Sequence, residues 1–194
     1  MNMFEIKTIL SLIAVILTFV GYAPYIRSLA KNHTKPHIYS WFIWSLDGFI
    51  IFALQFTHGA GPGSFVVLAA SLLALTVLFL TILNKGKRDI TLIDTIFTVL
   101  ALLALIVWLF AKQPLISVIL IMIVDVLGFL PTVRKSWHGP FTENAAFYAI
   151  NVMRFAMALT ALQAYSIITA LYPAVWLIIN ALFTVMLVLR RKVI

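Results

Sequence analysis

The sequence predicts an all-α integral membrane protein: seven transmembrane helices, arranged as two parallel three-helix bundles joined by a linker helix (3+1+3). The composition and an internal repeat lead to this fold class. Of the 194 residues, 63% are hydrophobic and 10% are charged, and the mean hydropathy is +1.10, which is too apolar for a soluble monomer. Cysteine is absent, so disulfides and thiol chemistry are excluded.

Seven continuously apolar segments are long enough for the roughly 20-residue helix that a hydrocarbon core of about 30 Å requires. Continuous rather than alternating hydrophobicity favours helices over a β-barrel, because a helix satisfies its own backbone hydrogen bonds in lipid. The first segment is interpreted as a mature helix rather than a cleaved signal peptide, since it carries half of the repeat. The segments are approximately 8–29, 38–57, 64–84, 90–111, 115–136, 142–164 and 168–189.

The internal repeat consists of two copies of a short motif. Residues 21–27 (GYAPYIR) return 107 positions later as residues 128–134 (GFLPTVR), and each copy closes an apolar run and opens a basic loop. A three-helix unit crosses the membrane an odd number of times, so one unrepeated helix between two units keeps them parallel. The predicted units are a first repeat (1–88), a linker helix (89–112) and a second repeat (113–194).

The net charge of +8 divides between the two membrane sides. The positive-inside rule places the amino terminus outside and the carboxyl terminus in the cytoplasm of a bacterial or archaeal cytoplasmic membrane. Anionic lipid headgroups explain the basic face, so we expect the lipid bilayer and no nucleic acid as a partner. One side receives Arg27, Lys31, Lys35, Lys85, Lys87, Arg88, Arg134, Lys135, Arg190, Arg191 and Lys192, the other receives Lys7 and Lys112, and Arg154 lies within a segment.

Two prolines recur at the same place in the two repeats. Pro24 and Pro131 each remove a backbone hydrogen bond and bend the helix near its cytoplasmic end. Gly21 and Gly128 precede them by three residues and soften the same turn. Recurrence in both copies favours a hinge over a static kink.

Three charged residues lie in the middle of apolar segments. An ionised side chain there costs about 2.5–3.5 kcal/mol, so Asp47, Asp125 and Arg154 should face partners or water. The sequence allows two alternative ion pairs: Asp47 with Arg154 across a central cavity, or Asp125 with Arg154 within the second bundle. Either pair could serve packing alone. An aspartate left unpaired, Asp47 or Asp125, is a candidate for proton coupling.

These features resemble a known family. Seven helices in a 3+1+3 layout, a proline near the end of the first helix of each repeat, and residues 44–48 (WSLDG), similar to the W-x-x-Y-G run of SWEET second helices, look like the PQ-loop superfamily, which includes SWEET sugar transporters and PnuC vitamin transporters. The resemblance implies alternating access with hinge prolines, third-helix asparagines that bind the solute, and second-helix aromatic residues that stack on it. Asn180 matches the second-repeat asparagine, and Ser71 is its candidate counterpart in an unresolved register.

The expected function is transport of a small polar solute, a sugar or a vitamin-like compound. Trp44 and Asp47 share one helical face, as do Asn151 and Arg154. Facilitated diffusion is the default, and proton coupling is the variant. Asn180 has the alternative of a helix-to-helix hydrogen bond. The expected solute-binding residues are Trp44, Asp47, Asn151, Arg154, Asn180 and Ser71.

Other functional classes are weighed on motifs and spacing. The sequence contains no P-loop, no nucleotide-binding glycine fingerprint and no carboxylate–histidine cluster, so we expect neither an enzyme nor a cofactor or metal site. Trp41, Trp108 and Trp137 fall near segment ends and are interpreted as an aromatic belt. A seven-helix binding or sorting receptor, similar to the KDEL-receptor fold, and a structural protein without ligand stay open, as does a homo-oligomer.

Overall fold

The structure is a computed structural model that describes residues 2–83, 90–110 and 113–193. All regular secondary structure within these ranges is helical, which confirms the all-α prediction. The elements are α1 (Met3–Ala30), α2 (Ile38–Thr57), the 3-10 helix η1 (Gly61–Ser64), α3 (Phe65–Leu83), α4 (Leu92–Phe110), α5 (Pro114–His138), the 3-10 helix η2 (Pro140–Thr142), α6 (Ala145–Ala161) and α7 (Ile167–Val193).

Several expectations fall outside the described residues. Residues 84–89 and 111–112 contain Lys85, Lys87, Arg88 and Lys112 and both predicted boundaries of the linker helix. The side chain of Trp108 also lies outside the described part of the chain. The sorting of charge by membrane side therefore rests on the remaining basic residues.

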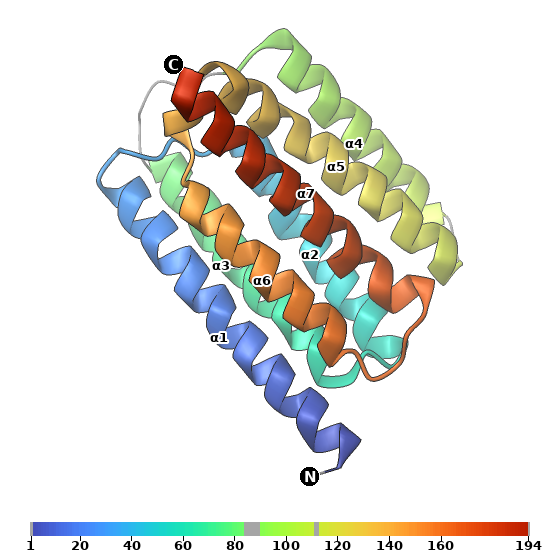
Figure 1. Cartoon of the computed structure of the whole chain (residues 1–194). Helices are drawn as coiled ribbons and strands as arrows, with labels where there is room; N and C mark the ends of the chain where they lie inside the picture. The colour runs from blue at the N-terminus through green and yellow to red at the C-terminus, as the bar shows by residue number, and fades with distance from the viewer. Residues whose placement is uncertain (1, 84–89, 111–112, 194) are drawn as a thin grey trace.

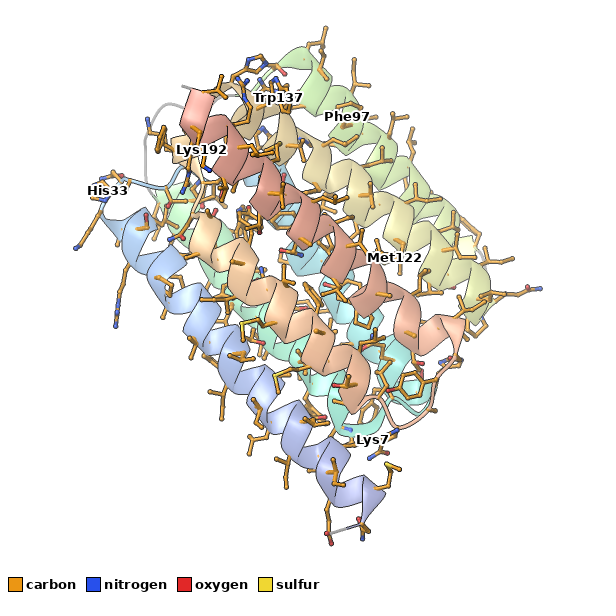
Figure 2. All side chains as sticks on the ribbon, in the orientation of Figure 1. Lys7, His33, Phe97, Met122, Trp137 and Lys192 are labelled. Carbon is orange, nitrogen blue, oxygen red and sulfur yellow. The ribbon has the colours of Figure 1, made fainter. Side chains whose placement is uncertain are left out.

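The α-helices run side by side in alternating directions (Figure 1). α1, α3, α5 and α7 finish at the end of the bundle that holds the carboxyl terminus, here called the basic end, and α2, α4 and α6 finish at the opposite end. Figure 2 shows His33, Trp137 and Lys192 at the basic end and Lys7 at the other. The last turns of α1, α5 and α7 bring Arg27, Lys135 and residues 190–192 to the basic end.

Helix ends follow local sequence signals. Asn2 and Glu5 form a capping box that starts α1 five residues before the predicted apolar segment. Pro114 opens α5 at a position where a missing amide hydrogen has no cost. Asn144 caps α6 by accepting from the backbone N–H of Phe147.

The distribution of side chains fits a multi-pass membrane protein. Five helices, α1, α2, α3 with η1, α5 and α7, are long and apolar enough to cross a membrane, and α6 is a shorter apolar helix. Large apolar side chains point outward, among them Phe79 at 61% and Leu182 at 66% exposure. Aspartates and an arginine are buried inside. Lipid tolerates apolar side chains on the outside, and ionisable groups face the interior.

The helices contact one another in two similar sets. α3 contacts both α1 and α2, and α7 contacts both α5 and α6. The two sets meet where α1 packs on α6 and where α2 packs on α5, and α4 packs mainly on α5. The second set, α5, α6 and α7, therefore has the same pattern of contacts as the first set, α1, α2 and α3.

An aromatic cluster fills the centre of the bundle near the basic end. Trp41 is fully buried and contacts Tyr22 and Tyr25 of α1 and Phe147 of α6. The interpretation of Trp41 as a belt residue is therefore wrong, because its face of α2 turns inward although the residue lies near the helix end. Trp137 is 49% exposed near the end of α5, as a belt residue would be.

Candidate solute-binding site

A cavity lies between helices of both sets. It contains about 430 Å³ of space free of protein atoms, including its open mouth, and leaves room for a few water molecules. α1, α2 and α3 contribute one side, and α6 and α7 contribute the other. Its lining residues are Tyr22, Trp44, Ala70, Ser71, Ala74, Phe147, Tyr148, Asn151, Arg154, Phe155, Tyr172, Trp176 and Asn180.

Helical spacing brings the polar residues of α6 to this cavity. Phe147, Asn151, Arg154 and Ala158 are buried and recur at intervals of three or four residues, so they share one face of the helix. Residues 53–55 (ALQ) return 108 positions later as residues 161–163, an offset that puts Arg154 opposite Leu46 and Phe155 opposite Asp47. Asp47 of α2 and Arg154 of α6 therefore occupy nearly equivalent levels in the two repeats. Of the six expected solute-binding residues, five line the cavity and Asp47 does not.

Asp47 of α2 instead lies against Asp125 of α5. Both residues are 1% exposed, and their carboxyl groups interact across the contact between α2 and α5. No other side chain among the described residues donates to Asp47, whereas Trp176 donates its indole N–H to Asp125. Two neighbouring buried carboxyl groups repel each other when both are ionised, so we expect the pair to share a proton.

Arg154 lacks a carboxylate partner in the described part of the chain. It is 3% exposed, and its Nε and Nη1 atoms have no hydrogen-bond partner. Its guanidinium carbon lies 4.0 Å from the ring centroid of Phe155, a cation–π contact. Neither expected ion pair, with Asp47 or with Asp125, forms. Both predictions are wrong because the two aspartates pair with each other and leave Arg154 at the cavity wall.

Trp176 and Tyr172 connect these charged groups. Trp176 lines the cavity while its N–H reaches Asp125, so one side chain separates the acid pair from the cavity. Tyr172 also lines the cavity and interacts electrostatically with Arg154 and with both aspartates. The sequence predicts no role for Tyr172, and it leaves two positions open for Trp176, nearly one turn before Asn180: the outer entrance of the site or contact with lipid.

The two amides on the cavity wall differ in their bonding. Asn180 donates from Nδ2 to the carbonyl of Trp176 at 2.6 Å, within its own helix. The Oδ1 atom of Asn151 has no hydrogen-bond donor in the described ranges. The expected alternative for Asn180, a helix-to-helix bond, is absent from the hydrogen bonds of the described residues.

Trp44 and Ser71 line the cavity from α2 and α3. The indole N–H of Trp44 has no acceptor among the described residues, and its ring meets that of Trp176 edge-on, with the centroids 5.5 Å apart. Ser71 donates to the carbonyl of Val67 at 2.8 Å. A Cβ atom on Gly48 would lie 2.2 Å from Ser71 Oγ, so the glycine is needed for α2 to approach α3.

The expected hinge residues lie where the two sets of helices meet. Pro24 and Pro131 are inside α1 and α5, and both helices continue beyond them. A Cβ atom on Gly21 would lie 3.1 Å from Ile150 of α6, and one on Gly128 would lie 2.8 Å from Ile43 of α2. Both glycines therefore permit close helix packing. Whether the prolines act as hinges stays a prediction.

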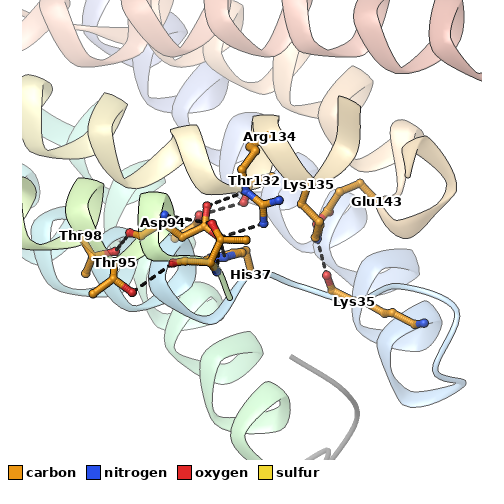
Figure 3. Close-up of polar contacts among 11 residues, drawn as sticks. Lys35, His37, Asp94, Thr95, Thr98, Thr132, Arg134, Lys135 and Glu143 are labelled. Carbon is orange, nitrogen blue, oxygen red and sulfur yellow. Dashed lines mark hydrogen bonds and ion pairs between the residues drawn. The ribbon is translucent and has the colours of Figure 1, made fainter. Parts of the chain in front are cut away.

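A buried acid at the basic end joins both sets of helices. Glu143 accepts from Tyr25 of α1 at 3.0 Å and from Tyr148 of α6 at 3.2 Å. It also pairs with Lys135 at 2.5 Å, and the Lys135 ammonium donates to the carbonyl of Lys35 (Figure 3). Nothing in the sequence marks Glu143 as buried, because an acid in a loop carries no pattern that distinguishes burial from exposure.

A second ionic cluster ties α4 to α5 at the same end (Figure 3). Arg134 makes a bidentate bond to Asp94, with Nε–Oδ1 and Nη2–Oδ2 distances of 2.8 Å. His37, before α2, places Nε2 3.4 Å from Asp94 Oδ2. Burial lowers the pKa of His37 from its ordinary value, although attraction to Asp94 opposes this shift.

Contacts also join the two sets at the end opposite the basic one. Lys7 of α1 donates to the carbonyl of Leu162 at 2.6 Å. Gln55 of α2 donates to the carbonyl of Thr169 at 3.0 Å. The cavity thus lies at mid-depth between two layers of contacts.

No His/Cys/Asp/Glu cluster in the described ranges could hold a metal ion. Comparison with protein-family models, with curated proteins and with solved structures finds no match to this chain.

Proposed function

We propose that the protein is a transporter with a 3+1+3 arrangement of seven membrane-spanning helices, and that it moves a small polar solute by alternating access. The observation that carries this proposal is the cavity between the two sets of helices, whose lining residues include Trp44, Asn151 and Arg154, each with a buried polar atom that has no hydrogen-bond partner among the described residues. Buried polar groups are normally hydrogen-bonded, so a solute or water that satisfies them is the simplest reason for their presence.

Two equivalent contacts support a duplicated architecture. Gly21 packs on Ile150, and Gly128 packs on Ile43. Both the glycines and the isoleucines are related by the offset of 107 that relates the two sequence motifs. The same interface is therefore built twice, as expected for two parallel bundles that rock against each other about a shared site.

Pro24 and Pro131 are the proposed hinges. Each lies three residues beyond one of these glycines, inside a helix that crosses the interface region. A missing backbone hydrogen bond makes the turn before each proline the place where the helix bends at least cost. Bending there would separate the Glu143 contacts at the basic end while the opposite end stays closed.

The proposed orientation puts the basic end in the cytoplasm. Arg27, Lys135 and residues 190–192 reach that end, and Lys7 reaches the other. Cytoplasmic loops carry the excess of lysine and arginine in membrane proteins. The amino terminus would then lie outside a cytoplasmic membrane.

Sugars and vitamin-like compounds are the first solutes to test, because the PQ-loop resemblance implies them. Trp44 would stack on the solute, and Asn151, Asn180 and Ser71 would supply hydrogen bonds. Facilitated diffusion is the reference case. The proton held by Asp47 and Asp125, one side chain from the cavity, supports proton coupling as the variant.

Thermal stabilisation of the purified protein by a panel of sugars and nucleosides, followed by flux of each stabilising compound into proteoliposomes, tests this function. Uptake that Trp44→Ala and Asn180→Ala both reduce is the expected result. A compound that stabilises the protein but does not cross would make the chain a binding protein. Wild-type uptake by both variants would remove the cavity as the transport site. A flux that responds to a pH gradient separates proton coupling from facilitated diffusion.

A further inference from the structure

Arg154 is a buried cation whose counter-charge the described residues do not supply. A guanidinium stays protonated in proteins and carries five N–H donors. In Arg154, Nε and Nη1 donate to nothing and the side chain is 3% exposed. An unpaired buried charge is strongly destabilising, so this residue is costly unless an anion binds beside it.

The nearby acidic residues contact other groups instead of Arg154. Asp47 and Asp125 contact each other, and Trp176 donates to Asp125. Neither forms a salt bridge with Arg154 among the described residues. The face of Phe155 covers one side of the guanidinium but brings no negative charge. The anion would therefore come from outside the described part of the chain.

Other groups at the cavity suit an organic molecule that carries a negatively charged oxygen group. The N–H of Trp44 lacks an acceptor, and the tyrosines 22 and 172 interact electrostatically with Arg154. Phe147, Tyr148, Phe155 and Trp176 add further aromatic rings to the lining. A single cation matches a single negative charge, which favours a carboxylate over a doubly charged phosphate. Aromatic side chains in the lining favour an organic anion over a halide ion.

We infer that the cavity binds a small organic monocarboxylate, whose carboxylate oxygens accept hydrogen bonds from Arg154. This inference rests on the proposed function, because it names the solute class of the same site. The resemblance-based expectation of a neutral sugar and this inference differ in one measurable property, the charge of the ligand.

The test is the thermal midpoint of the purified protein in detergent with sodium acetate, lactate or benzoate, and with the neutral amides of the same acids. Thermal midpoints in sodium chloride and sodium phosphate test whether other anions stabilise the protein as a carboxylate does. The variants are Arg154→Gln and Arg154→Lys. Arg27→Gln, at an exposed position near the end of α1, is the matched control for loss of one arginine.

We expect at least one carboxylate to stabilise the wild type and Arg27→Gln, while its amide, chloride and phosphate do not. Arg154→Gln should weaken its binding about 10-fold or more, the loss of one hydrogen bond to a charged group, and Arg154→Lys should weaken it less. Arg154→Gln should also raise the midpoint of the ligand-free protein, since an uncompensated charge is gone. That last result needs no knowledge of the ligand.

Equal responses to acid and amide, an undiminished response in Arg154→Gln, or no response to any carboxylate overturn the inference. If a neutral sugar or nucleoside stabilises the wild type and Arg154→Gln equally and is transported, the transport proposal stands and the monocarboxylate inference fails. If a carboxylate binds through Arg154 but does not cross a liposome membrane, the binding inference stands and the transport proposal fails.

Discussion

Asp47 of α2 and Asp125 of α5 contact each other through their carboxyl groups inside the bundle, with the indole N–H of Trp176 as the donor to Asp125. The contact crosses one of the two interfaces between the sets of helices. Two buried carboxylates this close repel each other unless one of them is protonated, so we expect the interface to store one exchangeable proton.

Asp47→Asn should remove this proton. The new amide can donate to Asp125, which then receives two N–H donors and ionises. Infrared spectra of the wild type at neutral pH should contain the carbonyl band of a protonated carboxyl group, and the variant should lose it. Asp94→Asn is the control, because Asp94 pairs with Arg134 and should not contribute to the band. A wild-type spectrum without the band would contradict the shared proton.

Gly128→Ala should destabilise the protein by about 1–3 kcal/mol, the usual cost of overpacking. The added Cβ atom would lie 2.8 Å from Ile43 Cγ2. Adding Ile43→Ala removes that methyl group and should recover part of the loss in a double-mutant cycle of thermal midpoints. Gly21→Ala, with 3.1 Å to Ile150, should cost less. Independent effects of the two substitutions at positions 43 and 128 would argue against the contact.

Glu143→Gln should destabilise the protein by about 3 kcal/mol, because Lys135 then keeps a buried charge without its carboxylate. Lys135 and Glu143 are 6% and 2% exposed. Replacing both, with Lys135→Met added, should restore much of the thermal midpoint. A single variant as stable as the wild type would show that this pair does not hold the basic end together.

Stability should fall as the pH drops below 6.5, the ordinary pKa of histidine. Burial holds the pKa of His37 below that value in the folded protein. The unfolded chain then binds a proton that the folded protein resists, with a slope of up to about 1.4 kcal/mol per pH unit for one group. His37→Gln should flatten this part of the curve of thermal midpoint against pH. His33→Gln, at an exposed position, should leave it unchanged, and identical curves for both variants would exclude His37 as the cause.

Hydrophobic runs predicted the helices well because apolar length is a property of the chain itself. Their ends were less predictable: α1 begins at Met3 through the Asn2 cap, and α7 continues to Val193 through charged residues. Membrane thickness limits the apolar part of a helix, whereas caps and solvated side chains decide where the helix ends.

The cavity lining was partly predictable, and the charge pairing was not. Spacing on α6 put Asn151 and Arg154 on one face, and both line the cavity. Periodicity gives the face and depth of a residue on its own helix but not which neighbouring helix it meets. Asp47 therefore met Asp125 on α5 instead of Arg154 on α6.

Alternating access at the cavity can be measured with one thiol, since the chain has no cysteine of its own. Ala70 lines the cavity and is 6% exposed, so Ala70→Cys puts the thiol on its wall. Thr76→Cys, exposed on the same helix, gives the control facing lipid. A membrane-impermeant thiol reagent, applied to sealed vesicles from one side and then the other, should label Ala70→Cys from both sides and Thr76→Cys from neither. Labelling of Ala70→Cys from one side only, or from neither, would contradict a cavity that opens in turn to the two faces of the membrane.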